Sequence, residues 1–320
     1  MAQYLPFVMQ SLFGRPHALA PAQAQMIVAA LSGRMDIRAL VDESSVMDAR
    51  AMADLAAMGR ISAAERGAGP ADIPSMQSAQ SELVYFGNSP PYALTDSGIA
   101  ILPVKGTLKR SWGIGPYSGA TGYDGLWTQM IHAEENQAVK AIWFDMNSGG
   151  GAVDGLFDLT DAIYSNSARF GGKPKWAMCA DYSASACYAI AAACDRVIMP
   201  ELGQCGSIGC VILHAEYSDA LEEDGVNVTI FRSRDRKARG GPLEKLDATE
   251  MKELQESCEE ADAVFARQVG IYRPRLTNSV IGEIDGRVYT GARALATGLI
   301  DAVMSEPEAW MELEQLVARS

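Results

Sequence analysis

The amino-acid sequence predicts an α/β fold, in which covering helices pack on a parallel β-sheet. Two observations lead to this fold class. Short apolar segments typical of buried strands recur along the chain, and segments with helical spacing separate them. Because parallel strands are joined by crossovers and are buried on both faces, this alternation favours a parallel sheet. The first strands are expected at Ile99–Val104, Val139–Met146, Trp176–Ala180 and Arg196–Met199.

Helices are expected between these strands and after them. Leu126, Met130 and Ala133 have helical spacing, and Asp247-Ala248-Thr249-Glu250 is a helix-start signal before a long amphipathic segment. The predicted helices are Tyr123–Ala133, Leu156–Ile163, Ala186–Ala193, Tyr217–Asp224, 247–271 and 306–320. Two further strands are predicted, one within Gly203–Leu213 and one at Val226–Phe231.

Residue composition divides the chain into four parts. Residues 1–66 are expected to form a small helical N-terminal arm, because apolar residues between Pro21 and Met58 have helical spacing. Glycine, proline and serine are frequent in the segment that follows, so 67–97 is predicted to be a linker. The main domain is expected at 98–305 and a C-terminal helix at 306–320.

Charge and cysteine content exclude several classes of protein. The chain of 320 residues has a net charge of −13, which argues against a protein that coats nucleic acid. No apolar stretch reaches the length of about 18 residues that a membrane span requires, and no signal peptide is expected. The six cysteines include no C-x-x-C pair, which favours reduced core thiols of a cytosolic protein over a disulfide frame or a zinc site.

Ser185 is the first candidate for a catalytic role. It lies where a predicted strand turns into an Ala-rich helix, within a run of small residues. Such a corner lifts one side chain above the sheet and leaves the first backbone N–H groups of the helix free to bind an oxyanion. The alternative is that Ser185 is an ordinary capping residue at a helix start.

A glycine run follows the strand that ends at Met146. Gly149, Gly150 and Gly151 allow close approach of a ligand to backbone N–H groups, which suits an oxyanion-binding loop. A nucleotide-binding loop is disfavoured, because the Lys-Ser/Thr pair of a P-loop and the G-x-G-x-x-G spacing are both missing. A simple tight turn remains the alternative.

These corners resemble motifs of the signal peptide peptidase family of serine proteases, peptidase family S49. Asn-Ser-Gly-Gly-Gly at 147–151 resembles its Asn-Ser-Pro-Gly-Gly loop, Ala-Ser-Ala-Cys-Tyr at 184–188 its Ala-Ser-Gly-Gly-Tyr, and Cys-Gly-Ser-Ile-Gly at 205–209 its Thr-Gly-Ser-Ile-Gly. The Gly-Arg-Val-Tyr-Thr-Gly segment at 286–291 begins a fourth family signature. The resemblance covers about 98–305 and implies a fold similar to Clp protease and crotonase.

The resemblance also implies a Ser-Lys catalytic dyad. The family pattern Ser-x-x-x-Lys-x-x-x-x-Pro fits Ser233, Lys237 and Pro242, which makes Lys237 the expected general base for Ser185. Backbone N–H groups of Gly150 and Ala186 are the expected oxyanion donors, and the mechanism requires no metal or organic cofactor. Without the resemblance, the arginine-rich segment around Lys237 is typical of a run of charged residues that is exposed to solvent.

A general base must be a neutral amine, so burial or nearby positive charge is expected to lower the pKa of Lys237. The arginines expected to contribute to such a field are Arg232, Arg234, Arg236 and Arg239. The sequence departs from the family at Gly149, which replaces a proline, and at Ala186-Cys187, which replaces two glycines.

Other residues are alternatives to the members of the dyad. Lys245 is an alternative base, and Cys187 an alternative nucleophile that lacks a base at a predictable position. The histidines His17, His132 and His214 are expected to be structural, with His214 the strongest exception.

The absence of a predicted anchor distinguishes this chain from membrane-anchored signal peptide peptidases. It resembles head maturation proteases of tailed phages and prophages, which implies a serine peptidase that processes scaffold, portal or capsid proteins in the host cytoplasm or procapsid interior. A homo-oligomeric ring is expected, in which Lys237 of one protomer serves Ser185 of the next. The alternatives are an inactive capsid assembly or scaffolding protein, a soluble signal-peptide-degrading protease and a crotonase-like acyl-CoA enzyme.

Overall fold

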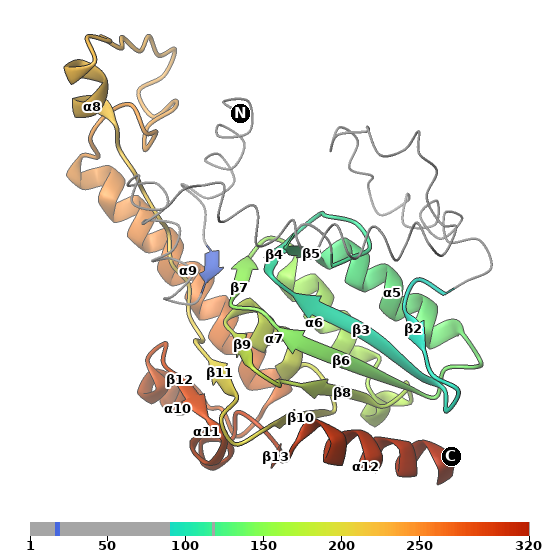
Figure 1. The fold of residues 1–320 in the computed structure, drawn as a ribbon. Helices are drawn as coiled ribbons and strands as arrows, with labels where there is room; N and C mark the ends of the chain where they lie inside the picture. Colours follow the sequence, from blue (N-terminus) through green and yellow to red (C-terminus); the bar gives the residue numbers. More distant parts are fainter. Residues whose placement is uncertain (1–16, 20–89, 117–118, 320) are drawn as a thin grey trace, which may run out of the picture. The chain divides into compact units, whose positions relative to one another are not determined.

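The computed structural model describes residues 17–19, 90–116 and 119–319 (Figure 1). Apart from residues 17–19, which form a strand, the helical arm predicted for 1–66 lies outside the described residues, and so does the greater part of the linker predicted for 67–97. The chain divides into two compact units. The sheet unit comprises Ala18–Gly209 and Phe265–Ser320, and the second unit comprises Met1–His17 and Cys210–Val264.

A six-stranded sheet forms the centre of the sheet unit, with the strand order β13-β10-β8-β6-β3-β2. All neighbouring strands are parallel except β2, which pairs antiparallel with β3. The strands are β2 (Ala93–Leu94), β3 (Ile99–Lys105), β6 (Ala141–Asn147), β8 (Lys175–Met178), β10 (Arg196–Met199) and β13 (Ala302–Val303). The predicted α/β class with a parallel sheet is confirmed, and β10 has the predicted bounds.

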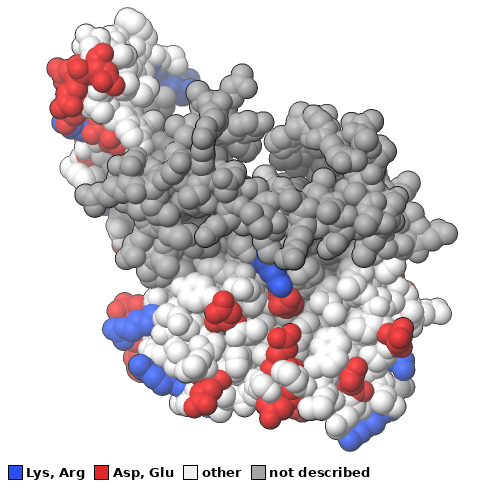
Figure 2. All heavy atoms as spheres, viewed as in Figure 1, with Lys and Arg blue, Asp and Glu red and all other residues white. Residues whose placement is uncertain are grey.

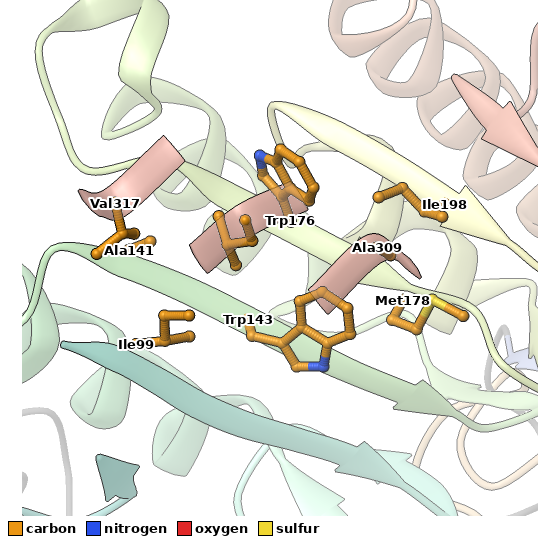
Figure 3. Close-up of a cluster of buried hydrophobic side chains, with 9 residues drawn as sticks. Ile99, Ala141, Trp143, Trp176, Met178, Ile198, Ala309 and Val317 are labelled. Carbon is orange, nitrogen blue, oxygen red and sulfur yellow. The ribbon is translucent and has the colours of Figure 1, made fainter. Parts of the chain in front are cut away.

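Three helices connect the strands of this sheet: α5 (Tyr123–Glu135), α6 (Leu156–Ser165) and α7 (Ala186–Ala192) (Figure 1). Helices α5 and α7 contact the sheet, and α6 packs against both of them. The long C-terminal helix α12 (Glu306–Arg319) packs against the sheet through Ala309, Leu313 and Val317. Figure 3 shows that its buried side chains meet Trp143 and Trp176 from neighbouring strands. Side chains alternate between the two faces of a sheet along each strand, so Trp143 and Trp176 can point to the same face from neighbouring strands.

Two smaller sheets carry the turns that the sequence singled out. One has the order β1-β7-β4-β5 and the other the order β12-β11-β9. Their strands are β1 (His17–Leu19), β4 (Thr107–Lys109), β5 (Ala120–Gly122), β7 (Gly150–Ala152), β9 (Tyr182–Ala184), β11 (Gln204–Gly206) and β12 (Val288–Thr290). The short helices α10 (Asn278–Ile284) and α11 (Gly291–Thr297) flank β12 in the chain.

A charged side chain is fully buried beside the central sheet. Lys175, at the start of β8, has a side chain that is 0% exposed and forms an ion pair with Glu134 of α5. Its Nζ also donates hydrogen bonds to the carbonyl oxygens of Asn166 and Lys173. Because three acceptors surround the ammonium group, its burial is compensated by polar partners.

The second unit contains α8 (Ser218–Glu223) and the first part of α9 (Ala248–Tyr272). The predicted start of α9 is confirmed, because Glu250 N donates to Asp247 Oδ1 (2.8 Å) and Asp247 N donates to Glu250 Oε2 (2.7 Å). No helix among the described residues has the length and apolar character needed to cross a membrane.

The strand predicted at Val226–Phe231 is wrong, whereas the strand predicted within Gly203–Leu213 is confirmed. The segment Val226–Phe231 forms no strand, and the Phe231 side chain is 93% exposed. Within Gly203–Leu213 the strand is β11 at the beginning of the segment, whereas Val211 is exposed. β-Branched residues favour extended backbone, but a strand also needs a neighbour to pair with, and composition does not supply that information.

Candidate active site

Ser185 lies at the corner between β9 and α7, as the sequence predicts. Its backbone has φ 58° and ψ −122°, a conformation that residues with a Cβ atom rarely adopt. Holding a non-glycine residue there costs about 1–3 kcal/mol, so the surrounding structure must enforce it. Strained backbone of this kind occurs at the nucleophile turns of hydrolases, where it exposes the hydroxyl at the end of the sheet.

Backbone hydrogen bonds from three segments hold this corner in place. Ser185 N donates to Gly206 O of β11 (2.7 Å), and Ala184 N donates to Ser148 O (3.0 Å). The first turn of α7 closes with a bond from Ala189 N to Ser185 O (3.0 Å). The corner is therefore fixed by β11, by the loop after β6 and by its own helix.

The Ser185 hydroxyl is buried and without a hydrogen-bond partner among the described residues. A buried hydroxyl without a partner is unfavourable by about 1–3 kcal/mol, and such groups are rare in folded proteins. A hydroxyl without a hydrogen-bond partner on a strained backbone is the arrangement expected of a nucleophile whose base or substrate group comes from outside the described residues.

The glycine loop lies next to the Ser185 corner. Ser148 forms a parallel bridge with Ser183 of β9, and Ser148 N donates to Tyr182 O (2.8 Å). The structure therefore brings the loop that contains Gly150 together with the strand that leads to Ser185. Ala186 is the first residue of α7, so its N–H has no acceptor in a preceding helical turn.

Ser148 has a role that sequence reasoning missed. Its hydroxyl donates to Gly106 O and accepts the N–H of Gly150 (3.0 Å), one of the two predicted oxyanion donors. Gly150 has φ 106°, a conformation that favours glycine. The signal that identifies this contact in the sequence is a serine two residues before a glycine, since a serine hydroxyl commonly accepts the N–H of residue i+2.

Gly151 has no room for a side chain. A Cβ atom at this position would lie 1.9 Å from Leu108 O, because β7 pairs with β4 and Gly151 lies opposite Leu108. Gly151→Ala is therefore expected to lower the free energy of unfolding by about 1–3 kcal/mol or more. Urea denaturation of the purified variant measures this change.

Gly282→Ala is the matched control for that substitution. A Cβ atom at Gly282 meets no atom within 4 Å, and the residue lies inside α10. Alanine is favoured over glycine in a helix by about 1 kcal/mol, so this variant is expected to be at least as stable as wild type. Equal stability of the two variants would contradict the described packing of β7 on β4.

Lys237 belongs to the second unit, whereas Ser185, Ala186 and Gly150 belong to the sheet unit. Its side chain is exposed, so the burial expected for a general base is not found within this chain. The expected basic field is also reduced, because three of the four nearby arginines have carboxylate partners. Arg232 pairs with Glu244, Arg236 with Glu253, and Arg239 with Asp235 and Asp247.

The alternative catalytic groups have structural partners or unsuitable surroundings. His132 Nδ1 lies 3.0 Å from Tyr92 Oη, and His214 Nε2 lies 3.4 Å from Gly241 O. Burial raises the pKa of Cys187 well above its ordinary value, which disfavours the thiolate that a cysteine nucleophile needs. Hydrogen bonding to Asp219 raises the pKa of Lys245, which disfavours the neutral amine. The side chain of His17 lies outside the described residues.

Figure 2 shows a group of Asp and Glu side chains at the upper left of the displayed face. Elsewhere on that face, acidic side chains are scattered among uncharged residues, and Lys and Arg side chains form small separate groups. All six cysteines are free, and four of them, Cys179, Cys187, Cys194 and Cys205, are buried as predicted for core thiols.

Comparison with known proteins identifies related sequences. Residues 167–319 match peptidase family S49. The chain is 33% identical over 310 residues to the capsid assembly protease C of Escherichia phage lambda, a match that covers 95% of this chain and 64% of the relative. It is 30% identical over 313 residues to the head-tail preconnector protein GP5 of Enterobacteria phage P21, which covers 97% of this chain and 57% of the relative.

The chain thus spans less than two thirds of the length of these two phage proteins. Among solved structures, it is similar to a mutant of the 1510-N membrane-bound stomatin-specific protease. That match has 16% sequence identity and a TM-score of 0.43, and it covers 68% of this chain and 85% of the other.

Proposed function

Residues 167–319 match peptidase family S49, and on this basis we propose that the chain is a serine endopeptidase of that family with Ser185 as its nucleophile. The observation that carries the proposal is the buried, unpartnered Ser185 hydroxyl at a strained strand-to-helix corner. Lys237 is the proposed general base, and the N–H groups of Gly150 and Ala186 are the proposed oxyanion donors.

In this mechanism, Ser185 Oγ attacks a peptide carbonyl carbon while its proton passes to Lys237 Nζ. The carbonyl oxygen becomes an oxyanion that accepts hydrogen bonds from Ala186 N and Gly150 N. Because Gly150 N already donates to Ser148 Oγ, the Ser148 hydroxyl shares or releases that N–H when the oxyanion forms. Lys237 then protonates the leaving amine, and a water molecule hydrolyses the acyl-enzyme with Lys237 again as the base.

The proposed substrates are scaffold, portal or capsid proteins of a tailed phage. This assignment is supported by similarity over nearly the whole chain to a capsid assembly protease and a head-tail preconnector protein. The proposed active form is a homo-oligomer, in which Lys237 of one protomer serves Ser185 of the next. Exposed apolar side chains of the second unit, such as Val226, Val228 and Phe231, support such an association.

The test is incubation of wild type and Ser185→Ala with phage structural proteins, followed by intact-mass spectrometry. Wild type is expected to produce defined fragments, and Ser185→Ala is expected to leave every protein intact. If neither protein cuts but both still bind a structural protein, the chain is an assembly factor and the proposed activity is wrong. Cleavage by Ser185→Ala at the wild-type rate would exclude Ser185 as the nucleophile.

A further inference from the structure

The backbone around Lys237 is held by two arginines on opposite sides of it. Arg232 Nε donates to Lys237 O (2.9 Å), five residues further along the chain. Arg239 Nε donates to Asp235 O (2.8 Å), two residues before Lys237. Both guanidinium groups therefore bind backbone carbonyls of the segment 235–237, in addition to their carboxylate partners.

Carboxylates fix the orientation of each guanidinium group. Arg232 Nη2 pairs with Glu244, and the Nη atoms of Arg239 contact Asp235 Oδ1 (3.2 Å) and Asp247 Oδ2 (2.7 Å). The planar guanidinium can serve a carbonyl and carboxylates at the same time, which the single ammonium of lysine cannot do with the same geometry.

Glu250 connects this segment to the first turn of α9. It is buried, and its Oε1 accepts the N–H of Gly240 (3.2 Å) while its Oε2 accepts the N–H of Asp247. Arg239 Nη1 lies 3.8 Å from the same carboxylate. The residues that follow Lys237 are therefore fastened to the start of a 25-residue helix.

We propose that Arg232 and Arg239 are positioning residues, which hold the backbone of Lys237 so that its amine reaches the reacting serine. This proposal rests on the proposed role of Lys237 as the general base. It replaces the expectation that these arginines act through a positive field on the lysine, because the structure pairs both of them with carboxylates.

The experiment compares Arg239→Gln with Arg236→Gln in the full chain, using a peptide that contains a mapped cleavage site. Both substitutions remove one positive charge from the same segment, and both break ion pairs: Arg236 pairs with Glu253, and Arg239 with Asp235, Asp247 and Glu250. Arg236 differs in that its guanidinium binds Glu253 but no backbone carbonyl among the described residues. Arg239→Gln is expected to lower kcat by roughly 10- to 100-fold with KM nearly unchanged, because a small displacement of a catalytic group has effects of that size. Arg236→Gln is expected to stay within about twofold of wild type, as a substitution that leaves the backbone in place.

Arg239→Lys separates positioning from a field effect. It conserves the charge but not the fork of donors, so kcat is expected to remain low and the pH midpoint of activity unchanged. Full recovery by Arg239→Lys, or an equal loss in Arg236→Gln with a midpoint moved to higher pH, would overturn the positioning role in favour of a field. Wild-type kcat in Arg239→Gln would overturn it as well.

Two further variants keep these outcomes distinct from failure of the proposed function. If Arg239→Gln does not fold, Arg232→Gln tests the same role from the other side of Lys237, with the same expected loss. Lys237→Ala is assayed in parallel. Wild-type activity in Lys237→Ala refutes the general base and the positioning role together, whereas an inactive Lys237→Ala beside a fully active Arg239→Gln refutes the positioning role alone.

Discussion

Lys237→Ala is expected to lower kcat/KM for peptide cleavage by about 10²- to 10⁴-fold, the contribution typical of a general base. A serine hydroxyl is a weak nucleophile at neutral pH unless a neighbouring group removes its proton. In the proposed mechanism the same amine also protonates the leaving group, so one substitution affects both halves of the reaction. Initial rates with a mapped cleavage-site peptide measure the loss.

Lys245→Ala is the matched control for this prediction. Lys245 is an exposed lysine of the same unit, but it pairs with Asp219 (2.8 Å), and that partner raises its pKa. A lysine held in its protonated form cannot accept the serine proton, so Lys245→Ala is expected to cleave at the wild-type rate. An inactive Lys245→Ala beside an active Lys237→Ala would exchange the roles of the two lysines.

Glu134→Ala is expected to have the largest effect on stability, a loss of about 3–5 kcal/mol in the free energy of unfolding. The substitution leaves the ammonium group of Lys175 without its carboxylate in a fully buried position. Two carbonyl oxygens remain as acceptors, but neither carries a full negative charge. Chemical denaturation with urea, monitored by tryptophan fluorescence, measures the loss because Trp143 and Trp176 are buried in the same sheet.

An exposed ion pair of the same unit provides the control. Arg196 and Glu312 are 2.5 Å apart, with side chains that are 26% and 46% exposed. Exposed pairs contribute about 0–1 kcal/mol, so Glu312→Ala is expected to unfold at nearly the wild-type urea concentration. Similar losses in Glu134→Ala and Glu312→Ala would show that burial of Lys175 does not determine the effect.

The sequence predicted the long, apolar elements of the sheet unit well. β3, β6 and β8 are formed within two residues of their predicted bounds, and α7 ends one residue early. The apolar residues of these segments follow a clear pattern in the sequence, and their burial in the folded protein favours the same secondary structure as their composition does. The predicted helix at the C-terminus is also confirmed, since α12 extends over Glu306–Arg319.

The short strands were not predictable in the same way. β5 and β7 are three residues long and consist of small residues such as Gly150 and Ala120, which have little strand propensity. They are strands because neighbouring backbone lies alongside them, which is a tertiary effect. The opposite error occurred at Val226–Phe231, where strong propensity is present but the segment is not a strand in this chain.

The same distinction applies to the candidate site: local sequence predicts some of its features, and contacts between distant residues determine the others. The position of Ser185 at a strand-to-helix corner follows from local sequence, and so does its proximity to the glycine loop once the sheet is known to be parallel. The positive φ of Ser185 and the contact between Ser148 and Gly150 depend on distant partners such as Gly206 and Gly106. The arginines near Lys237 were expected to act by charge, and only the structure revealed their bonds to backbone carbonyls.

Chemical labelling of the buried thiols around the Ser185 corner can report local opening of the structure. Cys179 follows β8, Cys187 lies in α7 and Cys205 lies in β11, and burial raises the pKa of Cys179 to about 12. A thiol-specific label reaches such groups only when the surrounding structure opens. The labelling rate of each cysteine therefore measures how often the buried region around Ser185 becomes accessible to solvent, without any engineered probe.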